Sequence, residues 1–173
     1  MKTILISLLL LLPAFGIAQK NCDYKIDEKA VLENKNLDGF LAAFKQQHFV
    51  VTNNSDDIPA FIKKQLNCIA GDFSIANPGE RYQAGCIVEK GVPKRQLIFL
   101  AKSRDFLVMT YLTGGFGTTT HFLFIKFKSD KIIDLWTGVG TGNIKHKSLD
   151  EITAYIKKFR FRNEGLNTNI IYL

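Results

Sequence analysis

The sequence predicts an α+β domain in which helices accompany an antiparallel sheet. Apolar residues recur with helical spacing near both ends of the mature chain, whereas β-branched and aromatic residues dominate from Arg81 onward. The polar segments between these β-rich runs are short enough to be hairpin turns. We therefore expect two N-terminal helices, an approximately five-stranded antiparallel meander, one C-terminal helix and a short terminal strand.

A secretory signal peptide is predicted over residues 1–18. Lys2 precedes an apolar stretch from Ile4 to Leu12, and small residues lead to a cleavage point after Ala18. The apolar stretch is about half the roughly 20 residues that a membrane span requires. We therefore expect a secreted or periplasmic protein without a membrane span, in which residues 19–173 form a single α+β domain.

Two amphipathic helices are expected at the start of this domain. The first follows Asn36 as its cap and has the apolar stripe Leu37, Phe40, Leu41 and Phe44. The second has Asp57 as its N-cap, Pro59 in its first turn and Gly71 after its end. Its apolar stripe consists of Ile58, Phe61, Ile62, Leu66 and Ile69.

The meander is expected to contain strands near residues 82–88, 95–102, 106–113, 120–128 and 131–137. The connections Ser103-Arg104-Asp105 and Ser129-Asp130 are too short for parallel crossovers, so they predict hairpins. Ser148 and Glu151 form the capping box of the third helix. Residues 169–173 are expected to add the short terminal strand.

Three cysteines, Cys22, Cys68 and Cys86, remain after signal cleavage. In an oxidising compartment they predict one disulfide and one remaining thiol, with all three pairings open. Their spacing lacks the CxxC pattern of redox and metal sites. Loss of Lys2 leaves 22 basic against 16 acidic residues, a net charge of +6, which suits an anionic partner.

The predicted hairpins bring two glycine-rich segments, residues 114–117 and 138–142, to one edge of the sheet, which we call the glycine rim. Glycine lets the backbone approach a ligand closely, and loops on a rigid sheet often carry binding residues. The structural alternative is that these glycines only shape turns while the nearby aromatic residues pack in the core. The candidate ligand-binding residues at the rim are Lys94, Arg95, Tyr111, Gly114, Gly115, Phe116, Gly117, His121, Trp136, Gly138 and Gly140.

No motif indicates a metal, a cofactor or nucleic-acid recognition. The three histidines lack HxxxH or HExxH spacing, and Gly138-x-Gly140-x-Gly142 departs from the G-x-G-x-x-G dinucleotide pattern. We therefore expect a binding module for a protein, glycan or small-molecule ligand, with an anionic ligand suiting its charge. One alternative is a hydrolase-like enzyme that uses His121. Another is a homo-oligomeric structural protein, such as a homodimer that buries Phe122 and Phe124.

Overall fold

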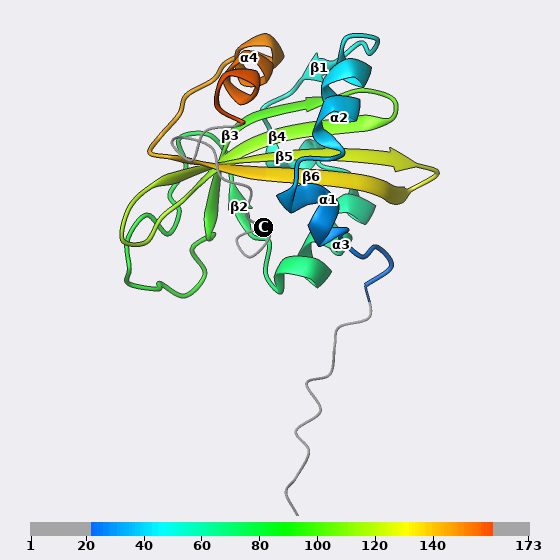
Figure 1. The fold of residues 1–173 in the computed structure, drawn as a ribbon. Helices are drawn as coiled ribbons and strands as arrows, with labels where there is room; N and C mark the ends of the chain where they lie inside the picture. Colours follow the sequence, from blue (N-terminus) through cyan, green and yellow to red (C-terminus); the bar gives the residue numbers. More distant parts are fainter. Residues whose placement is uncertain (1–21, 161–173) are drawn as a thin grey trace, which may run out of the picture.

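The computed structural model describes residues 22–160, so the predicted signal peptide and the strand expected at 169–173 lie outside the described residues (Figure 1). The helices are α1 (Glu28–Leu32), α2 (Leu37–Phe44), the 3₁₀ helix η1 (Ser55–Asp57), α3 (Ala60–Ala70) and α4 (Leu149–Phe159). The strands are β1 (Val50–Val51), β2 (Ile75–Ala76), β3 (Arg95–Lys102), β4 (Phe106–Thr113), β5 (Thr119–Lys128) and β6 (Lys131–Thr141). The predicted α+β class is confirmed.

Strands β3, β4, β5 and β6 form the predicted antiparallel meander. Both short connections are hairpins, and Ser129 and Asp130 form a two-residue turn with φ of 49° and 59°. The outer side of β3 pairs with two short strands that the sequence did not predict. One end of β3 lies antiparallel to β1, and its other end lies parallel to β2.

Helices cover both faces of the sheet, with α2 and α4 on one side and α3 on the other (Figure 1). The face below α2 and α4 contains Phe122, Phe124 and Trp136, all fully buried. The opposite face packs Leu123 and Ile125 in a core shared with α3. Both apolar faces of β5 are therefore covered within one chain, so Phe122 and Phe124 offer no exposed patch to a second copy.

Helix α1 and the segment that follows it lie along the outer edge of β6 (Figure 1). The Asn36 side-chain Nδ2 donates to the backbone oxygen of Leu135 at 2.9 Å and to Oδ1 of Asp134 at 2.7 Å. Trp136 Nε1 donates to Oδ1 of Asn34 at 2.9 Å. Asn36 occupies the predicted cap position of α2, but its side chain makes no cap hydrogen bond and instead occupies the sheet edge.

The predicted N-cap is wrong for α3 and correct for α4. Asp57 is not the N-cap of α3, because it belongs to η1, and Pro59 occupies that cap position. The residue before a proline avoids helical backbone angles, and Ile58 has a ψ of 121°. At α4, Ser148 Oγ accepts the amide of Glu151 as predicted, whereas the Glu151 carboxylate accepts the amide of Lys147.

The strand predicted near residues 82–88 is wrong, because this segment is a loop between β2 and β3. The Gln83 side chain bonds to the backbone on the far side of this loop: its Nε2 donates to the oxygen of Glu89, and its Oε1 accepts the amide of Glu89. Residues 138–141, predicted as a loop, instead extend β6. This extension pairs Gly138 with Phe122 and Gly140 with Thr120.

A disulfide joins Cys22 to Cys68 in α3, which confirms the predicted single bridge and selects one of the three pairings. Cys86 is the remaining thiol, and it is exposed. Across residues 22–160, the helices fall short of the length and apolar character that a membrane crossing demands.

Candidate functional site

A cleft of about 450 Å³ opens between the loop that precedes β3 and the turn that joins β4 to β5. We call it the β2–β3 cleft. Besides these two loops, the start of β3, the last residue of α3 and the residues that follow it contribute to the lining. Its lining consists of Ala70, Asp72, Gln83, Gly85, Cys86, Val88, Lys94, Arg95, Thr113, Gly114, Gly115 and Phe116.

The two loops of the cleft are packed backbone to backbone. A Cβ atom on Gly114 would lie 2.3 Å from the oxygen of Gln83 and 2.5 Å from Cα of Ala84, so only glycine fits there. The amide of Gly115 donates to the oxygen of Ala84 at 3.5 Å, and the amide of Gln83 donates to the oxygen of Pro93 at 2.8 Å. These backbone contacts therefore fix the two loops relative to each other, although the loops do not pair as strands.

Arg95 lies in the wall of the cleft with only 6% of its surface exposed. Its guanidinium lies 4.4 Å from the ring centre of Phe73 and 5.8 Å from that of Tyr111. Its Nη1 donates to the backbone oxygen of Asp72 at 2.9 Å. Aromatic rings stabilise a cation through their negative faces, so these contacts keep a permanent positive charge at the cleft.

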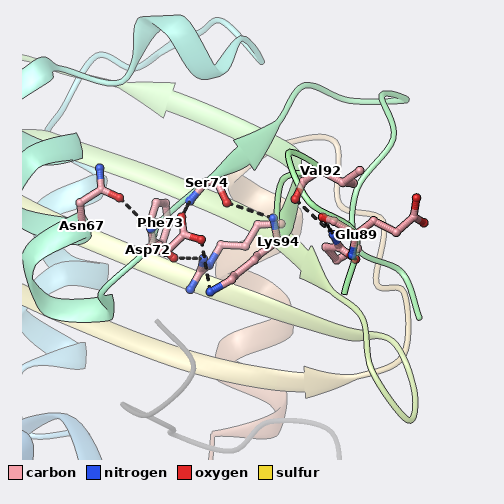
Figure 2. A network of polar contacts seen from close by, with 9 residues as sticks. Asn67, Asp72, Phe73, Ser74, Glu89, Val92 and Lys94 are labelled. Carbon is pink, nitrogen blue, oxygen red and sulfur yellow. Dashed lines mark hydrogen bonds and ion pairs between the residues drawn. The ribbon is translucent and has the colours of Figure 1, made fainter. Parts of the chain in front are cut away.

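Lys94 and Asp72 form an ion pair (Figure 2), with 3.2 Å between Lys94 Nζ and Asp72 Oδ2. Ser74 connects the two residues, since its amide donates to Asp72 Oδ1 and its hydroxyl accepts the Lys94 amide. Partial desolvation raises the pKa of Asp72, but the hydrogen bonds from Lys94 and Ser74 outweigh it and lower that pKa overall. Asp72 therefore remains an anion in the neutral pH range.

Exposed apolar groups line the outer part of the cleft. The Phe116 side chain is fully exposed, and Val88 is 81% exposed. The neighbouring Ile87, outside the lining, is equally exposed, and the exposed Cys86 is one of the lining residues. Large apolar side chains that cluster on a surface often mark a binding site.

His121 and Tyr111 lie on the α3 side of the sheet, where their rings stack at 5.0 Å. His121 is 1% exposed, and its Nε2 contacts the hydroxyls of Thr113 at 2.9 Å and Thr119 at 3.1 Å. Burial, with a smaller effect of the Arg95 charge, lowers the pKa of His121 to about 4. Burial raises the pKa of Tyr111 to about 12, although the Arg95 charge opposes this shift.

The structure brings five of the predicted rim residues together in the cleft lining: Lys94, Arg95, Gly114, Gly115 and Phe116. Gly117 belongs to the same β4–β5 turn, and the end of β6 reaches this turn through the Gly142 amide, which donates to the oxygen of Thr118 at 2.9 Å. The remaining candidates do not line the cleft. They are the buried strand residues Tyr111, His121, Trp136, Gly138 and Gly140.

The sequence reasoning missed seven other lining residues: Ala70, Asp72, Gln83, Gly85, Cys86, Val88 and Thr113. Four of them, from Gln83 to Val88, belong to the segment wrongly assigned to a strand. A usable signal was present: Asn77-Pro78-Gly79, Gly85 and Gly91 recur through residues 77–91, and such spacing is typical of a loop. Gly79 and Gly91 indeed have positive φ, 82° and 80°.

No group of three or more His, Cys, Asp or Glu side chains within residues 22–160 is arranged to hold a metal ion. Comparison of the chain with protein-family models, curated proteins and solved structures finds no match.

Proposed function

We propose that this protein is an exported binding module and that the β2–β3 cleft is its ligand site. The observation that carries the proposal is the combination, in one concave site, of a nearly buried guanidinium and a fully exposed phenyl ring. Ligand sites in proteins are typically concave and apolar, with a few polar groups that orient the ligand.

The contacts of His121 favour binding over the enzyme alternative. Within residues 22–160, its hydrogen-bond partners are two threonine hydroxyls, and no carboxylate is hydrogen-bonded to it. A general base of the usual kind has a pKa near the working pH, whereas burial lowers the pKa of His121 to about 4.

A titration of the ¹⁵N-labelled protein with 4-phenylbutyramide, a neutral aromatic probe, tests the proposal. We expect chemical-shift changes to cluster at the Gly85 and Gly115 amides, which border the cleft. Phe116→Ala should weaken binding, because it removes an exposed ring from the cleft. Ile133→Ala, which removes a half-exposed apolar side chain from β6, outside the cleft lining, is the matched control and should bind the probe like the parent.

Shifts scattered over the surface, or equal effects of the two variants, would contradict a site at the cleft.

A further inference from the structure

The charges of the cleft lining identify the chemistry of its ligand. Two cations, Lys94 and Arg95, face one anion, Asp72, so the ionised lining groups carry a net charge of +1. The cations approach from the start of β3, while the apolar side chains of Val88 and Phe116 come from the two loops. A ligand that satisfies both parts of the lining needs one negative charge and an apolar group.

We infer that the cleft binds an organic monoanion, a carboxylate attached to an aromatic or aliphatic group. The inference rests on the proposed binding function and adds the ligand class to it. The planar guanidinium of Arg95 lies against the rings of Phe73 and Tyr111, and planar recognition of carboxylates is the usual use of arginine in binding sites.

Asp72 is itself a carboxylate bound to one of the two cations of the cleft. Its carboxylate already lies 3.2 Å from the Lys94 ammonium, which shows that a carboxylate fits beside this cation (Figure 2). Lys94 and Asp72 are each about half exposed in their side chains, so a ligand carboxylate can reach the same ammonium. Asp72 thus competes with the ligand for Lys94, and its charge opposes an incoming anion.

This competition predicts opposite effects for two charge variants. Asp72→Asn removes the competing charge and keeps an oxygen that can accept the Ser74 amide. It should strengthen the binding of 4-phenylbutyrate by about two- to five-fold, the range of an exposed ion pair. Lys94→Gln should weaken that binding by about the same factor. Neither variant removes a buried side chain, so both should fold.

The test compares 4-phenylbutyrate with its neutral amide by calorimetry at low salt, in the parent and in both variants. Phenyl phosphate serves as a second anion that carries up to two charges. We expect the carboxylate to bind more tightly than the amide. The two variants should change the binding of the anions only, and salt should weaken the binding of the anions. Lys64→Gln on α3, outside the cleft lining, is the charge control and should leave the affinity for both probes unchanged.

Equal affinity for the carboxylate and the amide, with no effect of Asp72→Asn or Lys94→Gln, would overturn the inferred ligand class and leave the proposed binding function intact. Failure of both probes to shift the cleft amides would instead overturn the binding function. Tighter binding of phenyl phosphate than of 4-phenylbutyrate would replace the carboxylate with a phosphate ester, and so would also contradict the inference.

Discussion

His121 makes the folded state sensitive to acid, because its imidazole is buried without a charged partner that would stabilise the protonated ring. Its folded pKa of about 4 lies below the ordinary value of 6.5. Between these two values the unfolded chain binds more protons than the folded chain, so the free energy of unfolding falls as pH decreases. The stabilisation is complete above about pH 6.5 and is lost toward pH 4.

We predict that His121→Gln removes this part of the acid sensitivity. A glutamine amide can still bond to the hydroxyls of Thr113 and Thr119, but it does not titrate. Between pH 6.5 and 4, the parent should lose up to about 1.4 kcal/mol per pH unit more than the variant. Urea unfolding at several pH values measures this difference, and His48→Gln, at an exposed position, is the control.

Parallel pH profiles for the parent and His121→Gln would show that the buried imidazole does not control the acid response.

Individual side chains were harder to predict than the elements that carry them. Asn36 occupies the position expected of a helix cap, yet its side chain bonds to β6, a partner about a hundred residues away. Trp136 was a candidate for the rim, but the pleat of β6 directs it to the face below α2, where its ring lies 5.0 Å from Phe124. Such choices depend on register, which a local pattern does not determine.

At the scale of elements, Gly114 determines how closely the two loops of the cleft approach each other. We predict that Gly114→Ala forces these loops apart, because its Cβ would meet the backbone of Gln83 and Ala84 at 2.3–2.5 Å. Backbone atoms cannot move aside as a flexible side chain can, so we expect a loss of about 1–3 kcal/mol in stability. Thermal unfolding and amide exchange at Gly115 measure the effect.

Gly117→Ala in the same turn is the matched control. A Cβ atom there has no neighbour within 4 Å, and its backbone does not require glycine. This variant should keep the parent's melting temperature and its affinity for 4-phenylbutyramide. Gly114→Ala should have a lower melting temperature and bind 4-phenylbutyramide more weakly. Equal behaviour of the two variants would mean that the loop contact does not shape the cleft.

The spacing of apolar residues predicted the elements whose local sequence pattern matches the way they pack in the fold. The stripes of α2 and α4 and the hairpins of β3 to β6 follow from patterns within a few residues. Prediction failed for residues 82–88, where Tyr82, Ile87 and Val88 have the composition of a strand but find no open strand edge, because β2 pairs with the start of β3. Most of the missed cleft residues belong to this segment.

At the scale of the whole molecule, the chain wraps around one edge of its own sheet. From Cys22, which is bonded to α3, it passes along β6 through α1 and continues as α2 on the opposite face (Figure 1). The Gln65 side chain on α3 accepts the amide of Tyr24 and donates to Asp23, which adds to the covalent attachment of Cys22. This wrapping covers both sheet faces and explains why β5 is apolar on both sides.

The disulfide should therefore stabilise the whole molecule. Cys22 and Cys68 are 46 residues apart in sequence, and their bond encloses α1, α2, β1, η1 and most of α3. Closing a loop of this length restricts the unfolded chain, so the double variant Cys22→Ser/Cys68→Ser should lose about 2–4 kcal/mol of unfolding free energy. Urea unfolding measures the loss, and a reducing agent should lower the parent to the stability of the variant.

Cys86→Ser is the control, because this thiol is exposed and outside the disulfide. It should remain within about 0.5 kcal/mol of the parent and respond fully to the reducing agent. Peptide mapping of the oxidised protein should recover Cys22 linked to Cys68. A large loss in Cys86→Ser, or a linked peptide that contains Cys86, would mean that the oxidised chain pairs differently and that the attachment of the N-terminus to α3 depends on other contacts.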